Sequence, residues 1–505
     1  MIFLSRWRQR LPFLVVFLVL SGCGAQNVNL VTGESQRGAY SWTQQVQLGG
    51  QADQQIVAQY GLTTNAGVAD YVDELGNVVL SNAFDAIERA AASGEVQLDR
   101  AAFSEIRQTP FTFRVLDSPV VNAFALPGGY VYVTRGLMAH LDNEAQLAMV
   151  LGHEIGHVVA QHSSRQAFKA QLGQLGVVGA AIGGAVLGGG DLAQGILEYG
   201  SQGAQLLFLK YGRDAEREAD EAGVAYSEFS GYDAAQAADF FRSLGRIQEA
   251  GGGALPSFLS THPDPSEREQ TIPQLASLYE GTMVNASEYL AEIEGMVLGE
   301  NPREGFVENG VFYHPELAFR FTVPNGWQVS NTRQAVLIGE PNGRAILQLS
   351  LASQSSAAQA AQELRGQQGI SVTGQENYSA NGNPAVLLEG QAAQQTGSIS
   401  FLASYIEYGG NVYEILGYTN QQGYQTYAPE FSRTMRSFQR LSDSQYLNRQ
   451  PVRLDVVTVN RSAPFSSFLN GRADVPGLTP EGLAILNQVG LSETIPSGTQ
   501  LKLPR

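Results

Sequence analysis

The run His153-Glu-Ile-Gly-His157 constrains this chain more than any other feature, because it lies within a long apolar stretch. Leucine, valine and isoleucine recur there at a spacing near 3.6 residues, which predicts a buried helix over 142–162 with Asp142 as its cap. Histidines four residues apart lie on one face of a helix, so both imidazoles can bind one metal ion. Two structural histidines in a helical core are the alternative interpretation.

Glu154 lies next to the first histidine in sequence and about 100° away from it around the helix. From that position a carboxylate can take a proton from a zinc-bound water molecule as the water attacks a peptide carbonyl. The pattern therefore predicts a zinc endopeptidase with Glu154 as its general base. The five-residue pattern alone also occurs by chance in long sequences.

A catalytic zinc ion needs a third protein ligand and one open position. The segment Arg213-Asp-Ala-Glu216-Arg-Glu-Ala-Asp220 offers the best candidate, because Glu216 and Asp220 share one helical face. We expect Glu216 to bind the metal and Asp220 to accept the other N–H of a ligating histidine. Without the histidine run, the segment would be a solvated, charged helix face.

Cys23 is the single cysteine of the chain and ends the run Leu20-Ser-Gly-Cys23. The run follows basic residues and an apolar stretch too short to span a bilayer, and it resembles a bacterial lipobox. We therefore expect a lipoprotein signal peptide over 1–22 and a polar linker over 23–50 that starts at a lipidated Cys23. An ordinary secretory signal is the alternative. A lipidated cysteine leaves only histidines and carboxylates as metal ligands.

Charge and length limit the function further. The chain has 505 residues and a formal net charge of −17, which excludes nucleic acid as a partner, because phosphates need a basic surface. Gly24 replaces the aspartate that retains many bacterial lipoproteins at the inner membrane. By resemblance to that sorting rule, we expect the periplasmic face of the outer membrane.

The sequence pattern divides the rest of the chain into three parts. Residues 51–300 are mainly helical in pattern, with extended segments at 111–115 and 129–134 that predict a small sheet. Residues 305–440 combine short strand runs with two helical stretches, which predicts an α+β sandwich. Residues 451–505 form a small C-terminal module. The expected fold class is therefore multidomain, with a mainly α first domain.

Four ordered motifs resemble the gluzincin metallopeptidase family of HtpX and the CaaX prenyl proteases, and most of all its periplasmic BepA-like members. The motifs are the histidine run, the acidic segment, a stretch before the metal helix and a His-Pro element, at 153–157, 213–220, 121–137 and 260–268. The resemblance covers about 51–285 and implies a zincin-type domain with one zinc ion per chain.

The resemblance also implies roles for single residues. The zinc ligands that it implies are His153, His157 and Glu216. It implies Glu154 as the general base, and His262 matches a histidine that approaches the metal or stabilises the transition state. Arg213 is expected to pair with Asp220 or with groups around the metal. The other histidines, at 140, 162 and 314, lie outside the motifs and are expected to be structural or solvated.

The C-terminal half departs from the BepA-like pattern, because tetratricopeptide repeats often follow the peptidase part in that group. Here residues 305–440 resemble a PsbP/Mog1-type sandwich and residues 451–505 a LysM-type module. A LysM-like module implies proximity to peptidoglycan, whereas a simple docking unit is the other interpretation. Partners of the repeat-bearing proteins do not transfer to this chain.

The expected function is quality control in the bacterial envelope, by cleavage of unfolded or misassembled envelope proteins. An exposed strand at 129–134 would add an extended substrate by main-chain hydrogen bonds. The glycine-rich stretch 173–203 would be a lid or touch the membrane surface, and a spanning hairpin is less favoured. Peptidoglycan and the outer-membrane assembly machinery are further candidate partners. The alternatives are a chaperone for outer-membrane proteins with a latent zinc site, and a metal-dependent peptidoglycan amidase.

Overall fold

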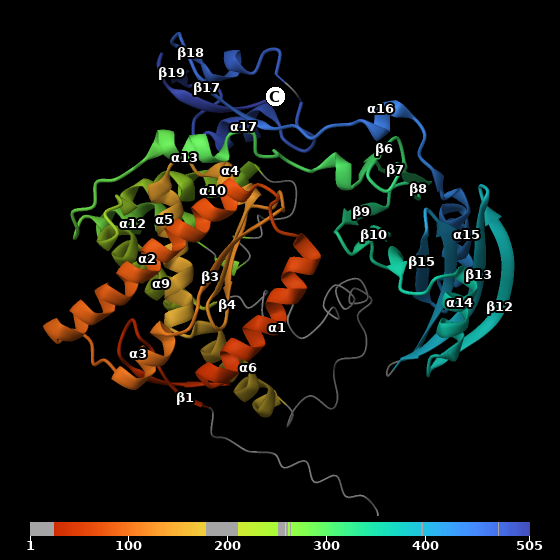
Figure 1. The fold of residues 1–505 in the computed structure, drawn as a ribbon, viewed down its shortest axis with the longest axis horizontal. Helices are drawn as coiled ribbons and strands as arrows, with labels where there is room; N and C mark the ends of the chain where they lie inside the picture. Colours follow the sequence, from red (N-terminus) through yellow and green to blue (C-terminus); the bar gives the residue numbers. More distant parts are fainter. Residues whose placement is uncertain are drawn as a thin grey trace, which may run out of the picture.

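The computed structural model describes residues 25–177, 211–250, 258, 261–262, 264–394, 397–472 and 474–505. The signal peptide, Cys23 and most of the glycine-rich stretch lie outside these residues. The described chain forms a helical part, a separate sandwich beside it and a small C-terminal unit packed on the helical part (Figure 1). The expectation of several domains that combine helices and sheets is confirmed. Within the described residues, no helix has the length and hydropathy needed to cross a membrane.

The helical part surrounds the helix that carries the histidine run. Its helices are α1 (Trp42–Tyr60), α2 (Ala66–Ser93), α3 (Arg100–Arg107), α4 (Arg135–His140), α5 (Glu144–Val159), α6 (His162–Val177), α9 (Arg213–Phe229), α10 (Ala237–Ala250), α12 (Pro265–Ala276) and α13 (Ala286–Ile293). Every residue of α5 is buried, because α2 and α9 pack against it and a small sheet covers another side.

The cap of α5 differs from the prediction. Asn143, not Asp142, is the N-cap, and its side chain accepts a hydrogen bond from the Gln146 amide at 3.0 Å. Asp142 instead forms an ion pair with Lys502 of the C-terminal unit, and its Oδ1 lies 2.5 Å from the Lys502 Nζ. The helix prediction itself is correct to within a few residues.

The small sheet of the helical part has the strand order β3-β5-β4, with β3 (Thr112–Leu116), β4 (Ala123–Leu126) and β5 (Tyr130–Thr134). The strand expected at 129–134 is β5, and it lies in the middle, parallel to β3 and antiparallel to β4. The prediction that this strand is an exposed edge is therefore wrong. The edge strand next to α5 is β4, which a single strand pattern could not reveal, because strand order depends on tertiary contacts.

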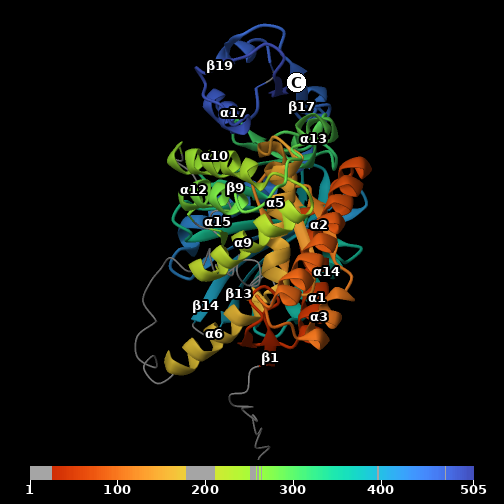
Figure 2. The same ribbon diagram turned by 90° about the vertical axis from the view of Figure 1, so that its left-hand side faces the viewer.

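Residues 25–50 do not form the expected linker. They contain the hairpin β1 (Ala25–Val28) and β2 (Ser35–Gly38) and the start of α1. Gln36 Nε2 donates to the Ala160 carbonyl at 2.7 Å, Leu30 is fully buried, and β1 and α6 lie at the same end of the helical part (Figure 2). The polar composition suggested a spacer, but these amides hydrogen-bond to backbone groups of the folded domain.

The sandwich contains a seven-stranded antiparallel sheet of order β12-β13-β14-β15-β11-β10-β9 and a four-stranded sheet of order β16-β8-β7-β6. Its elements are β6 (Phe306–Glu308), β7 (Val311–His314), β8 (Phe319–Thr322), β9 (Gln328–Asn331), β10 (Ala335–Gly339), β11 (Ala345–Ala352), α14 (Ala357–Gly366), β12 (Ile370–Ala380), β13 (Asn383–Gln394), β14 (Gly397–Tyr408), β15 (Asn411–Asn420), α15 (Tyr424–Ser437) and β16 (Gln439–Arg440). α14 and α15 contribute to two separate apolar clusters of the large sheet. A hairpin turn at Gly409-Gly410 joins β14 to β15.

The C-terminal unit follows α16 (Ser444–Leu447) and packs on the helical part near α4, α10 and α13 (Figure 1). Its elements are β17 (Leu454–Thr458), β18 (Ala463–Pro464), α17 (Pro480–Leu486), β19 (Thr494–Ile495) and β20 (Gln500–Pro504). Its apolar residues share one buried cluster with α2, α5 and α10. The buried Lys502 Nζ donates to the carbonyls of Ala139 and Leu141 at 2.9 and 2.8 Å. The unit is thus part of the apolar core that includes α5.

Replacing Lys502 with methionine is expected to lower the free energy of unfolding by about 2–4 kcal/mol. The apolar side chain keeps much of the volume but leaves two carbonyls and Asp142 without their donor. Urea unfolding measures the change, and Lys169→Met on an exposed position of α6 is the control. A loss no larger than that of the control would show that the unit is only loosely attached.

The close contact between α5 and α9 depends on two glycines, which have no side chain. Gly152 of α5 faces Gly223 of α9, and a Cβ added to Gly223 would lie 2.8 Å from the His153 nitrogen and 3.0 Å from its Cα. Such distances force the two backbones apart. The glycine pair therefore sets how closely the helix with Glu216 approaches the helix with the histidines.

Gly223→Ala is expected to lower the free energy of unfolding by about 1–3 kcal/mol and to weaken metal binding, because α9 must move away from His153. Gly245→Ala, in α10, is the control, since a Cβ there meets no atom within 4 Å. The control should be neutral or stabilising by up to about 1 kcal/mol. Equal effects of the two changes on thermal unfolding would contradict the steric explanation.

Candidate metal centre

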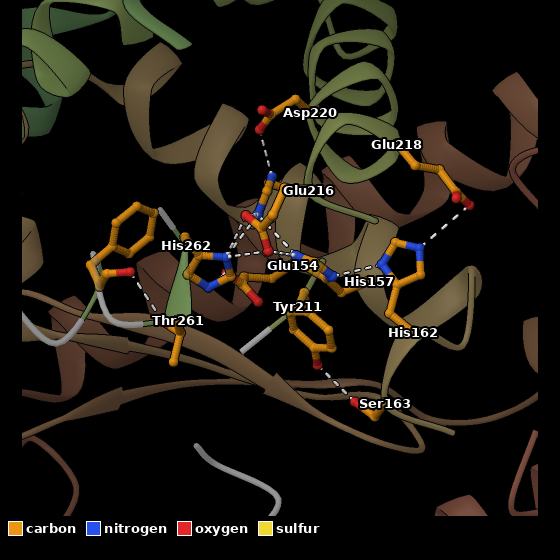
Figure 3. Close-up of polar contacts among 12 residues, drawn as sticks. Glu154, His157, His162, Ser163, Tyr211, Glu216, Glu218, Asp220, Thr261 and His262 are labelled. Atoms are coloured by element: carbon orange, nitrogen blue, oxygen red, sulfur yellow. Dashed lines mark hydrogen bonds and ion pairs between the residues drawn. The ribbon is translucent and has the colours of Figure 1, made fainter. Parts of the chain in front are cut away.

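Four buried side chains converge between α5, α9 and the segment before α12. They are His153, His157, Glu216 and His262, and one ligand atom of each lies within 4.8 Å of the others. The Nε2 atoms of His153 and His157 are 3.0 Å apart and lie 3.8 and 3.6 Å from the Glu216 carboxylate. Figure 3 shows His157, Glu216 and His262 pointing toward one another, with Glu154 beside them.

The geometry fits a divalent metal ion. Bonds of about 2.0–2.1 Å in a tetrahedral site place neighbouring ligand atoms about 3.3 Å apart, close to the separations found here. Burial and the surrounding histidines hold the pKa of His157 well below its usual value, so its nitrogen stays free to bind a metal. Burial alone would raise the pKa of Glu216, but His262 and Arg268 lower it to about 2. The site thus combines the neutral imidazole of His157 with the ionised carboxylate of Glu216.

Glu154 is almost completely buried beside this cluster. Its Oε1 lies 3.5 Å from the His262 Nε2 and has no hydrogen-bond partner within the described part of the chain. Burial raises the pKa of Glu154 above its ordinary value, which makes the carboxylate a stronger proton acceptor. The structure therefore places the expected base within reach of the cluster.

Asp220 and Arg213 of α9 are the two side chains expected to support the metal ligands. Asp220 Oδ1 lies 2.9 Å from the His153 Nδ1, opposite the nitrogen that faces the cluster. Arg213 is mostly exposed and pairs with Asp264 at 3.3 Å, so its expected pairing with Asp220 is wrong. Arg268 of α12 takes that place, because its Nε donates to Asp220 at 2.9 Å and its Nη2 to Glu216 at 2.5 Å.

Two further side chains contact His157 that the sequence pattern does not predict. The His162 Nδ1 lies 2.7 Å from the His157 Nδ1, and the Tyr211 ring stacks on the His157 ring with centroids 4.2 Å apart. The sequence predicts only a structural or solvated position for His162. Its place directly after the metal helix was the available signal. His140, in contrast, lies away from the site, and its Nδ1 is hydrogen-bonded to the Gly136 carbonyl at 2.8 Å.

A buried helix with two histidines one turn apart, an acid beside them and a carboxylate from a second helix together define a gluzincin-type metallopeptidase centre. Residues 89–276 match the model of Peptidase family M48. The chain therefore contains a Peptidase family M48 domain, and the prediction of a metallopeptidase of this kind is confirmed.

Curated relatives match between about a third and a half of the chain. Mitochondrial metalloendopeptidase OMA1 of Arabidopsis thaliana is 32% identical over 187 residues, which cover 36% of this chain and 35% of that protein. The beta-barrel assembly-enhancing protease of Yersinia pestis is 29% identical over 248 residues, which cover 48% of this chain and 46% of that protein. The chain thus spans less than half the length of these relatives.

Solved structures match a shorter stretch of the chain. Cyanobacterial PsbP from Synechocystis aligns with 16% sequence identity and a TM-score of 0.23, over 26% of this chain and 91% of that chain. A similarity of this size carries no argument about function. The PsbP/Mog1-type and LysM-type assignments therefore stay predictions.

Proposed function

We propose that this chain is a zinc-dependent endopeptidase of the bacterial envelope that cleaves unfolded or misassembled envelope proteins. The observation that carries the proposal is the buried Glu154 carboxylate beside the cluster of His153, His157 and Glu216. A metal-binding protein without catalytic function has no need for a buried carboxylate at this place. The names of the relatives, which include beta-barrel assembly-enhancing proteases, support a substrate class in the envelope.

Different residues would bind the metal ion and transfer the proton in the proposed reaction. Zinc, when bound, acts as a Lewis acid and lowers the pKa of a water molecule. His153, His157 and Glu216 would hold the ion, and Arg268 keeps Glu216 ionised and oriented. Glu154 would accept the proton of the attacking water and then pass it to the leaving amine.

The edge strand β4 offers a place for the substrate. β4 is antiparallel to β5 on one side, and its residues Ala125 and Leu126 lie close to His157. An extended peptide that adds to this edge by main-chain hydrogen bonds would lie next to the metal centre. Such binding makes few demands on side chains, which suits unfolded substrates of varied sequence.

The proposed location is the periplasmic face of the outer membrane, through a lipid on Cys23, which lies outside the described residues. For the C-terminal unit, attachment to the core through Lys502 favours a docking role over peptidoglycan binding. Peptidoglycan contact therefore depends on surfaces of this unit that face away from α4. Pull-down of the purified protein with peptidoglycan sacculi distinguishes the two roles.

A latent metal centre is the second candidate, and His262 is the observation that favours it. The His262 Nδ1 lies 3.3 Å from the His153 Nε2 and 3.1 Å from Glu216 Oε2, which is where a fourth ligand would be. A fourth protein ligand closes the open position that a catalytic zinc needs. The protein would then hold substrates as a chaperone until His262 withdraws.

His262→Ala is therefore expected to raise the cleavage of an unfolded substrate by about tenfold, because it opens the fourth position. The measurement is the initial rate of cleavage at fixed zinc occupancy. Tyr279→Phe, on a partly buried residue whose ring packs on Phe229 and not on the cluster, is the control. A fall in rate would instead assign His262 to stabilisation of the transition state.

The proposed function is tested with the purified protein and a reduced, unfolded protein substrate, with and without a chelator. Cleavage that disappears with the chelator and returns with zinc supports the proposal. Suppressed aggregation without any cleavage would favour the chaperone, and release of amides from peptidoglycan alone would favour the amidase.

A further inference from the structure

His157 has a polar contact on each of its two nitrogens. Its Nε2 faces the cluster, 3.0 Å from the His153 Nε2 and 3.6 Å from Glu216 Oε1. Its Nδ1 faces away from the cluster and lies 2.7 Å from the Nδ1 of His162, the first residue of α6. Figure 3 shows His162 between His157 and Glu218.

The position of His162 is fixed by the turn between α5 and α6. Gln161 has a positive φ of 56°, which reverses the chain direction directly after the metal helix. Its amide Nε2 donates to the Val28 carbonyl at 3.0 Å, which anchors the turn to β1. As a result His162 is 1% exposed and folds back beside His157.

Metal binding through the His157 Nε2 determines which ring nitrogen carries the proton in His157 and in His162. A ligating Nε2 carries no proton, so the neutral ring carries its proton on Nδ1 and donates it to the His162 Nδ1. His162 then accepts at Nδ1 and carries its own proton on Nε2, which lies 3.4 Å from Glu218 Oε1. The reverse assignment would place a proton on the His157 Nε2 and prevent metal binding.

Glu218 is itself held in place from two sides. Asn29 Nδ2, in the turn after β1, donates to Glu218 Oε1, and the Arg165 guanidinium lies 3.5 Å from Glu218 Oε2. α9 thus supports both histidines of α5. Asp220 contacts His153 directly, whereas Glu218 reaches His157 through His162.

We propose that His162 and Glu218 are positioning residues that orient His157 and fix its tautomer for zinc binding. The proposal rests on the proposed zinc site but not on peptide cleavage. It makes the hairpin of β1 and β2 part of the support of the metal centre. If His162 only filled the core, its volume would determine its effect on zinc affinity. If it positions His157, the acceptor at its Nδ1 determines that effect.

Two substitutions of His162 separate these roles. His162→Asn keeps an acceptor, because the asparagine Oδ1 occupies nearly the same place as the histidine Nδ1, although the side chain is smaller. His162→Leu fills more of the space but offers no acceptor to the His157 N–H. The measurement is the zinc dissociation constant of the full chain, by competition with a chelator of known affinity. Thermal unfolding of the metal-free proteins reports the structural cost of each change.

The leucine variant is expected to bind zinc about 10–100-fold more weakly, and the asparagine variant to stay within about threefold of the wild type. Glu218→Leu should weaken binding, and Glu218→Gln, which keeps an oxygen acceptor, should weaken it less. Equal zinc affinities of the leucine and asparagine variants would overturn the proposal, as would wild-type affinity in Glu218→Leu. A wild-type protein that binds zinc but cleaves nothing would contradict only the proposed function.

Discussion

Glu154→Gln is expected to reduce the cleavage of an unfolded protein by about 10²–10⁴-fold, because the amide cannot accept the proton of the attacking water. The substitution keeps the shape of a side chain that is 1% exposed, so the fold and the zinc site should persist. Initial cleavage rates at equal zinc occupancy measure the effect. Removal of a buried carboxylate with a raised pKa should leave thermal stability unchanged or slightly higher.

The control for this prediction is Glu74→Gln, on an exposed position of α2 that lacks any contact with the cluster. It should cleave like the wild type. If Glu154→Gln cleaves as fast as this control, the assigned general base is wrong even if zinc is bound. If both lose activity together, the effect comes from stability and not from the mechanism.

Glu216→Gln is expected to weaken zinc binding by about 10³-fold or more, because it replaces the anionic member of the cluster by a neutral amide. It also removes one of the two carboxylates that pair with the buried Arg268, so some loss of stability accompanies it. Zinc affinity is measured by chelator competition, and stability by urea unfolding of the metal-free protein.

Asp220→Asn provides the matched comparison, since Asp220 contacts the same arginine but touches His153 only on the side away from the cluster. It should lose about 10–100-fold in zinc affinity, less than Glu216→Gln. The assignment of Glu216 as a ligand fails if the two variants bind zinc equally well.

The sequence predicted the metal centre better than its surroundings. His153 and His157 lie in a helix with a clear apolar period, and Glu216 and Asp220 share a helical face, so local spacing alone places each pair. Arg268 could not be assigned from spacing, because its contacts with Glu216 and Asp220 depend on how α12 packs on α9. Sequence distance gives no measure of such tertiary contacts.

The same limit explains the differences in the fold. Strand patterns located β5 but not its central place in the sheet, since neighbours are chosen by tertiary packing. The polar composition of residues 25–50 predicted a linker, although Gln36 and Asn29 use their amides to bind the domain. The buried Lys502 could not be recognised as an anchor, because lysine is usually exposed.

The most direct test of the central claim is a crystal structure of the zinc-loaded protein with anomalous data at the zinc edge. We expect one strong anomalous peak per chain, about 2.0–2.2 Å from the Nε2 atoms of His153 and His157 and from the Glu216 carboxylate. Anomalous density elsewhere, or none at this cluster in zinc-loaded crystals, would contradict it.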